Sequence, residues 1–221
     1  MSTQSSRPTA RRSFLTRLNV GAASIAALTL GGIARAQVKP GTTVRWEPTR
    51  HAQDDWMDAL PGKHRLVIDT TTLDGIRDGL LFAGNFILAN RTDYGLKNED
   101  VAVIVVARHF STHFALNNDM WTKYGAPLNE APTGGTPPKE PLKANPNASS
   151  LASLAGQGVH FAVCSMAMNR VAGIIAKSTG GKAETIFAEL NANLVANSHP
   201  VAAGIVALNR AQERGYSFVS A

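Results

Sequence analysis

The chain has 221 residues, a formal charge of +6, 44% apolar residues and one cysteine. This apolar content argues against intrinsic disorder, and a single cysteine excludes an internal disulfide framework and a CxxC metal site. The charge is unevenly distributed, because residues 1–36 contain five arginines and neither Asp nor Glu. The remaining chain is close to neutral, so we expect no nucleic-acid partner.

Residues 1–36 have the organisation of a targeting signal. Arg11-Arg12-Ser13-Phe14-Leu15 resembles the twin-arginine export motif. The apolar stretch 20–33 is shorter than the about 20 residues that span a bilayer, and Ala34-Arg35-Ala36 offers a small-x-small cleavage site. We expect a mature chain that starts at Gln37, reaches the periplasm folded and has no stable membrane insertion. An ordinary secretory signal with a chance arginine pair is the alternative.

Residues 37–63 contain three prolines and no sustained period, which predicts an irregular N-terminal extension. Within it, residues 54–60 fit a short helix, and we expect Trp56 and Met57 to fasten the extension to the body. The body itself, residues 64–221, is expected to form one α/β domain.

Apolar runs alternate with helical patterns through this domain. We expect strands at residues 64–72, 101–107, 159–164, 194–196 and 216–219. We expect helices at residues 73–88, 112–123, 150–155, 166–177, 184–191 and 201–214. Residues 125–147 hold six of the eleven prolines and predict an inserted loop, the least ordered part of the mature chain.

This alternation predicts a three-layer α/β/α fold of Rossmann or flavodoxin type, with a mostly parallel sheet of about five strands. No strand is followed by GxGxxG or GxxxxGK[ST]. The chain therefore has no signature of a tightly held dinucleotide, and we expect no cofactor.

Ligands of open parallel sheets bind outside the carboxyl ends of the strands, and several polar residues are predicted there. The candidate catalytic residues are Cys164, His109 and Arg108. The candidate ligand-binding residues are Thr70, Thr71, Thr72, Ser165, Asn197 and His199. We expect Cys164, His109 and the turn 70–72 to share one pocket.

Cys164 stands at a predicted strand end, immediately before a helix. A helix N-terminus stabilises a thiolate, which can carry a persulfide or act as a nucleophile. The alternative is a buried cysteine that packs as a small hydrophobic residue. His109 and His113 are spaced i, i+4, which would put two imidazoles on one helix face, but a metal site needs a third ligand and we expect no metal.

Two segments of the chain resemble a known family. Residues 158–164 (Gly-Val-His-Phe-Ala-Val-Cys) and residues 202–218, with Gln212-Glu213-Arg214-Gly215-Tyr216, are similar to the DsrE/DsrF-like sulfur-relay superfamily. The resemblance covers residues 159–219, and the strand-helix-strand order agrees over residues 64–107. It implies an α/β/α domain that assembles into homo-oligomers and carries sulfur on the cysteine matching Cys164.

Three functional interpretations are therefore open. The first is an exported sulfur carrier or thiol-active protein that uses Cys164, with a sulfur-donor or sulfur-acceptor protein or a small thiol as partner. The second is a ligand-binding or interaction module without covalent chemistry. The third is a metal-dependent enzyme that uses His109 and His113.

Overall fold

A computed structural model describes residues 47–135 and 137–221. The predicted leader and the first part of the extension, residues 37–46, lie outside the described residues. Within the described ranges, no helix has both the length and the apolar character needed to cross a membrane.

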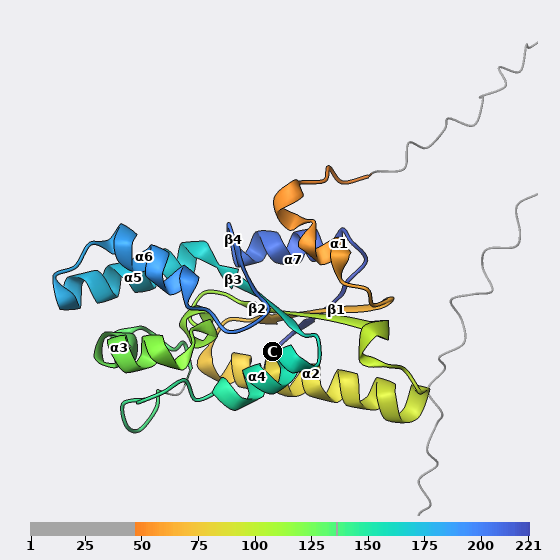
Figure 1. The fold of residues 1–221 in the computed structure, drawn as a ribbon, viewed down its shortest axis with the longest axis horizontal. Helices are drawn as coiled ribbons and strands as arrows, with labels where there is room; N and C mark the ends of the chain where they lie inside the picture. The colour runs from red at the N-terminus through yellow and green to blue at the C-terminus, as the bar shows by residue number, and fades with distance from the viewer. Residues whose placement is uncertain (1–46, 136) are drawn as a thin grey trace, which may run out of the picture. The chain divides into compact units, whose positions relative to one another are not determined.

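A five-stranded, all-parallel sheet forms the centre of the domain (Figure 1). Its strands are β1 (His64–Thr70), β2 (Val101–Ala107), β3 (His160–Cys164), β4 (Ser198–Val201) and β5 (Ser217–Ser220), and their spatial order is β4-β3-β2-β1-β5. Every residue of β2, the middle strand, is buried, as expected for an apolar strand covered on both faces.

The α-helices of the described chain are α1 (Trp56–Ala59), α2 (Leu73–Tyr94), α3 (Asn118–Glu130), α4 (Ala148–Gly156), α5 (Ser165–Thr179), α6 (Ala183–Ala192) and α7 (Gly204–Gln212). Short 3₁₀ turns are η1 (Ala52–Asp54), η2 (Asn98–Asp100) and η3 (Thr112–Ala115). The longest helix, α2, begins where Thr72 Oγ1 accepts a hydrogen bond from Gly75 N, and it ends at Gly95 in the left-handed conformation.

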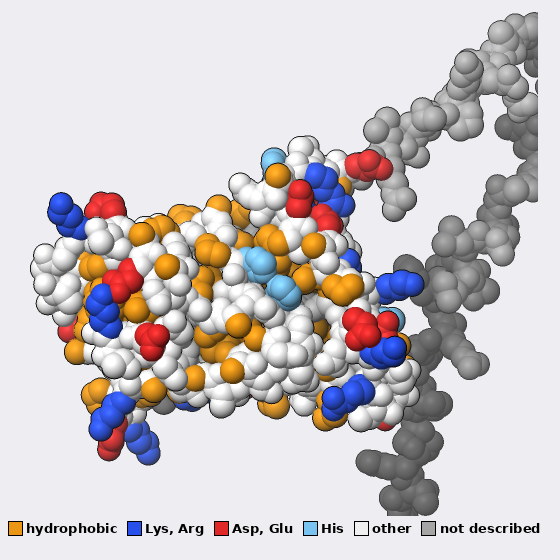
Figure 2. All heavy atoms as spheres, viewed as in Figure 1, with side chains coloured by type: hydrophobic (Ala, Val, Ile, Leu, Met, Phe, Trp, Pro, Cys, Tyr) orange, Lys and Arg blue, Asp and Glu red, His pale blue; other side chains and the backbone are white. Residues whose placement is uncertain are grey.

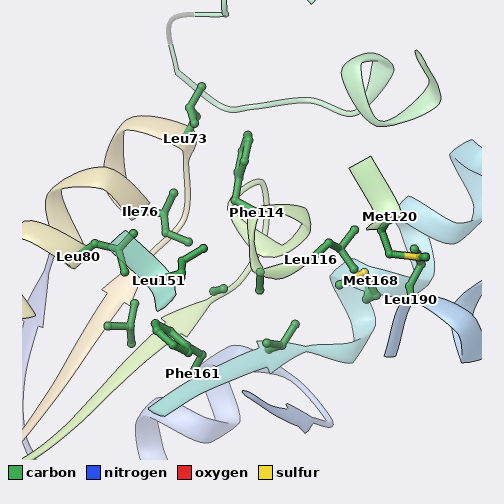
Figure 3. Close-up of a cluster of buried hydrophobic side chains, with 14 of the residues drawn as sticks. Leu73, Ile76, Leu80, Phe114, Leu116, Met120, Leu151, Phe161, Met168 and Leu190 are labelled. Carbon is green, nitrogen blue, oxygen red and sulfur yellow. The ribbon is translucent and has the colours of Figure 1, made fainter. Parts of the chain in front are cut away.

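Two hydrophobic clusters cover the two faces of the sheet, because alternate residues of a strand point to opposite sides. On one face α2 to α6 pack on Val103, Val105 and Phe161. Figure 3 shows side chains from several of these elements meeting there, among them Ile76, Leu151 and Phe161. On the other face α1 and α7 pack on residues such as Ile104. The predicted three-layer α/β/α fold is confirmed.

The two faces also determine where a ligand can enter. The chain leaves β3 into α5 on the first face, whereas it leaves β4 into α7 on the second face. The neighbouring strands β3 and β4 are therefore followed by helices on opposite sides of the sheet. Such a topological switch point opens a crevice at the carboxyl ends of the two strands.

The described part of the extension, residues 47–63, is better organised than its prolines suggested. It contains η1 and α1, and Met57 is completely buried. Met57 O accepts hydrogen bonds from Tyr216 Oη (2.7 Å) and Arg65 Nη1 (3.2 Å). Arg65 also donates to Gly62 O and Leu60 O. Buried backbone carbonyls satisfied by a guanidinium fix this segment to the domain.

The region predicted as a helix at 112–123 and a loop at 125–147 is divided differently. It forms η3, then α3, which continues through Pro127 to Glu130 with non-helical angles at Tyr124. The proline falls in the first turn after this kink, where its missing N–H leaves no helical bond unmade. The later part of the segment is also anchored: Asn145 Nδ2 donates to the carbonyls of Phe114 and Leu116.

The predicted strand at residues 194–196 is wrong. Leu194 forms only an isolated antiparallel bridge with Leu116, and β4 lies further along the chain. The apolar signal at Leu194 arises because this side chain packs against the larger hydrophobic cluster. β4 itself contains Pro200, which an edge strand tolerates because one side of it needs no hydrogen-bond donor.

Candidate functional site

A cavity of about 270 Å³ opens at the switch point between β3 and β4. Cys164, Arg108, His109 and Arg170 line it, together with apolar side chains and the first residues of α7. A larger cavity of about 470 Å³ lies between α2 and α4, but Arg77 is its only ionisable lining residue. The smaller cavity combines a thiol, an imidazole and two guanidinium groups, so it is the better candidate for chemistry.

Cys164 is the last residue of β3 and the N-cap of α5. Its side chain makes no capping hydrogen bond, and the residue is 6% exposed. Cys164 lines the cavity beside the first turn of a 15-residue helix. Backbone N–H groups of a first turn have no partner within the helix, and together with the helix dipole they favour an anion there.

Arg108 is held by a carboxylate from the neighbouring strand. Its Nε and Nη2 donate to Asp69 Oδ1 and Oδ2, both at 2.7 Å. The hydrogen bond to Asp69 is the main cause that raises the pKa of Arg108, and proximity to Cys164 adds to it. A bidentate pair with a carboxylate that is 7% exposed fixes the guanidinium and neutralises its charge.

Gly204, the first residue of α7, allows this helix to start against Arg108. A Cβ added at Gly204 would lie 2.5 Å from Arg108 Cβ, closer than two carbon atoms can approach. The glycine is therefore needed for close approach, and it brings the N-terminus of a second helix to the cavity.

Hydroxyl groups behind Arg108 support the strand ends. Ser111 Oγ accepts from Arg108 N at 3.0 Å and lies 3.0 Å from Thr70 Oγ1. Thr70 Oγ1 donates to Val106 O at 2.8 Å. Thr70 is completely buried by these contacts, so its hydroxyl supports the fold.

Only some of the residues expected to share a pocket with the turn 70–72 line this cavity. Cys164, Arg108 and His109 do meet, but the three threonines are absent from the cavity lining described for this region. The carbonyl of Thr71 accepts from Phe110 N at 2.9 Å, and Thr72 caps α2. Ser165 is the first residue of α5 and half-buried, next to the cavity lining.

Arg170 is a site residue that the sequence reasoning missed. Its Nη2 donates to His109 O at 2.9 Å, and its guanidinium lies 5.4 Å from the centroid of the Phe110 ring. His109 has a φ of 60°, an unusual conformation for a residue other than glycine, and its ring lies 3.7 Å from that of Phe110. Helical side chains lean towards the N-terminus, so a long side chain in the second turn of α5 could have been expected to reach the strand end.

Asn197 and His199 lie at the amino ends of the strands and not at the carboxyl ends, which corrects their predicted place. Because β4 starts at Ser198, both residues are at its amino end. Asn197 Nδ2 donates to the carbonyls of Ala155 and Val159, closing the turn that leads into β3. These two residues are therefore not neighbours of Cys164.

His199 belongs to an aromatic stack. His160 Nδ1 lies 2.8 Å from His199 Nε2, and the ring of Trp56 is parallel to His199 with centroids 3.8 Å apart. Burial, and to a lesser extent the charge of His160, lower the pKa of His199 to about 4, and burial lowers the pKa of His160. Figure 2 shows histidine side chains among hydrophobic ones over β3 and β4. These lowered pKa values favour the neutral form of both imidazoles.

His109 and His113 do not share a helix face. His109 precedes the 3₁₀ turn, while His113 lies inside it, 1% exposed and packed on Phe114 and Trp121. Burial, and then the charge of Arg170, lower the pKa of His113 to about 4. In residues 47–135 and 137–221, no group of three or more His, Cys, Asp or Glu side chains is arranged to hold a metal ion.

Comparisons with known proteins give little further information. No protein-family model and no curated protein matches the sequence. A protein of unknown function from Methanobacterium thermoautotrophicum, MTH1491, has a solved structure that is similar to this chain. The similarity has a TM-score of 0.41 and 19% sequence identity, and it covers 72% of this chain and 100% of that one.

Proposed function

We propose that the protein is a sulfur carrier that binds a sulfane sulfur on Cys164 and passes it to an acceptor thiol. The observation that supports this proposal is the position of Cys164, which faces an open cavity beside two guanidinium groups and a helix N-terminus. A cysteine that only fills space in the core does not need these neighbours. The resemblance to the DsrE/DsrF-like superfamily agrees with this role.

The proposed step is a sulfur exchange without a net oxidant. The Cys164 thiolate attacks the outer sulfur of a persulfide R–S–SH, so that a new S–S bond forms and the S–S bond between the two sulfur atoms of the donor breaks. The leaving group departs as R–S⁻ with the electron pair, and Cys164 becomes a persulfide. The N–H groups of α5 and α7 stabilise negative charge on both sulfur species.

Intact-mass measurement tests the proposal directly, because Cys164 is the only cysteine. The purified protein is incubated with a persulfide donor, separated from it and then mixed with an acceptor thiol. We expect a gain of one sulfur atom that the acceptor removes, and no gain in Cys164→Ser. A matched control, Cys164→Ser with Ser153→Cys, carries an exposed thiol on α4. Equal loading of this displaced thiol would contradict a dedicated site.

A binding module without covalent chemistry is the second candidate, and the low exposure of Cys164 favours it. At 6% exposure the sulfur is accessible only through the cavity. The rate of alkylation of Cys164 separates the two candidates. A sulfur carrier requires alkylation at least as fast as that of the displaced thiol in the double variant, Cys164→Ser with Ser153→Cys, whereas a binding module allows an inert Cys164.

We further propose that the protein acts in the periplasm after twin-arginine export. The support is the Arg11-Arg12 motif with its short apolar segment, which lies outside the described residues. Replacing both arginines by lysine should leave the precursor in the cytoplasm, as cell fractionation would show. Normal export of this double variant would indicate an ordinary secretory signal.

Self-association is also part of the proposal. Leu81 and Leu88 on α2 are 58% and 48% exposed, so α2 offers an apolar surface to a second copy. Sedimentation should detect a homo-oligomer that Leu81→Glu with Leu88→Glu dissociates. A wild-type protein that sediments as a monomer would refute this part.

A further inference from the structure

We propose that the cavity selects sulfur donors that carry a negative charge, and that Arg170 is the residue that recognises this charge. This inference rests on the proposed function, since it names the class of molecule that would load Cys164. The class is a small anionic sulfane-sulfur donor, with a carboxylate or an oxyanion next to the reactive sulfur.

The charges around the cavity support this choice. Two guanidinium groups line the cavity, and Asp69 neutralises only that of Arg108. No carboxylate pairs with Arg170 anywhere in the part of the chain that the structure describes. One full positive charge is therefore available to a ligand.

Arg170 is exposed, but two contacts orient its guanidinium before a ligand arrives. One N–H bonds to His109 O, and the plane of the guanidinium is supported by Phe110. A guanidinium has five N–H donors, so most of them stay available to an anion. A side chain already held in place loses less conformational entropy on binding than a free surface arginine does.

The remaining wall strengthens the effect of this charge. Met166, Ala203 and Ile205 provide apolar lining, and charge interactions are stronger beside apolar atoms than in bulk water. Met166 and Ile205 are 70% and 61% exposed, so they form an apolar rim through which a small molecule enters.

The sulfur transfer balances for both sources of this chemistry. With thiosulfate, Cys164–S⁻ bonds to the outer sulfur, the bond between the two sulfur atoms of thiosulfate breaks, and sulfite leaves with the electron pair. With the persulfide of a carboxylate-bearing thiol such as glutathione, the leaving group is the thiolate. In both cases Arg170 neutralises part of the donor charge that would otherwise repel the Cys164 thiolate.

Two alkylating reagents of nearly equal size test the inference without any sulfur transfer. Iodoacetate is anionic and iodoacetamide is neutral, and each can react with the single cysteine. The Cys164 alkylation rates are measured with both reagents in the wild type, Arg170→Gln and Arg170→Lys. The control is Arg91→Gln. Arg91 is exposed in the last turn of α2, shortly before the chain enters the amino end of β2.

We expect Arg170→Gln to slow iodoacetate about fivefold, the size of one favourable exposed charge pair, and to leave iodoacetamide unchanged. Arg170→Lys should retain most of the iodoacetate rate, and high salt should remove the difference between the reagents. Equal slowing of both reagents, or the same change in Arg91→Gln, would overturn the role of Arg170.

The outcomes also separate this inference from the proposed function. If Cys164 reacts and loads sulfur but shows no charge preference, only the inference fails. If Cys164 is inert to both reagents, the proposed function fails and the inference with it. Loading with thiosulfate against loading with glutathione persulfide then identifies which anionic source is used, and loading by neither overturns the donor class.

Discussion

The two ends of β3 show how differently the same strand can treat polar side chains. At its carboxyl end, Cys164 faces an open cavity with charged groups and two helix N-termini. At its amino end, His160 is hydrogen-bonded to His199 and close to the aromatic ring of Trp56, and burial lowers the pKa of both imidazoles, which favours their neutral forms. Helices that follow parallel strands begin at the carboxyl edge, so anionic chemistry is favoured at that edge alone.

The largest effect should come from removing Asp69, the carboxylate that holds Arg108 at the carboxyl end of β3, which we call the charged end. Asp69→Ala leaves Arg108 without its bidentate partner in a largely buried place. We expect a loss of about 2–4 kcal/mol in the free energy of unfolding, measured by urea denaturation. A loss similar to that of an exposed ion pair, below about 1 kcal/mol, would mean that solvent replaces Asp69.

The amino end of β3, which we call the neutral end, should instead make the stability of the protein sensitive to acid. Because the pKa of His199 is about 4 in the folded protein against 6.5 ordinarily, the unfolded chain binds more protons as the pH falls from 6.5 to 4. The contribution of His199 to the free energy of unfolding is complete above pH 6.5 and is lost as the pH falls to 4. It amounts to about 2 kcal/mol after allowing for solvent at a half-exposed side chain. His199→Gln should flatten the pH dependence of the urea midpoint. The exposed His64→Gln is the control, and an equal flattening there would contradict the assignment.

A pair of glycine variants tests the close packing at the charged end. Gly204→Ala places a methyl group against Arg108 and should cost about 1–2 kcal/mol and change the alkylation rate of Cys164. Gly173→Ala, in the exposed middle of α5, has open space and should stabilise the helix by about 0.5–1 kcal/mol. Thermal unfolding would show opposite signs, and the same sign for both variants would contradict the close approach.

The smallest expected effect on Cys164 itself, no change in its alkylation rate, concerns the boundary of the site. Thr72→Ala removes the N-cap of α2 and should reduce stability by about 1 kcal/mol. Its alkylation rate at Cys164 should equal that of the wild type, because Thr72 does not line the cavity. An altered rate would place the threonine turn in the site after all.

The sequence predicted the charged end of β3 better than the neutral end, for a physical reason. Buried parallel strands such as β2 and β3 are almost entirely apolar, so their ends are easy to find and Arg108, His109 and Cys164 fall together. The edge strand β4 pairs with a neighbouring strand on one side only. Its sequence, Ser198-His199-Pro200-Val201, carries little strand signal. Because the strand was predicted at Leu194, Asn197 and His199 were expected at its carboxyl end, whereas they lie at the amino end of β4.

Contacts that depend on the backbone conformation of a distant residue could not be predicted. The lean of helical side chains indicates the direction of Arg170, but its partner is the carbonyl of His109, whose left-handed conformation no local pattern predicts. Asn145 likewise donates to the carbonyls of Phe114 and Leu116, which lie 31 and 29 positions earlier in the chain, and no local pattern predicts these contacts.

The strand order has a consequence for the sequence of folding events. β1, β2 and β3 are neighbours both along the chain and in the sheet, and α2, α3 and α4 connect them, so much of the larger hydrophobic cluster can assemble as the chain lengthens. β5 pairs with β1, and the paired residues Leu66 and Ser217 are roughly 150 positions apart. Such distant pairing slows folding, because a long loop must close before any contact rewards it. The smaller cluster contains both Met57 and Tyr216, so we expect it to be completed only after these two distant segments of the chain have met.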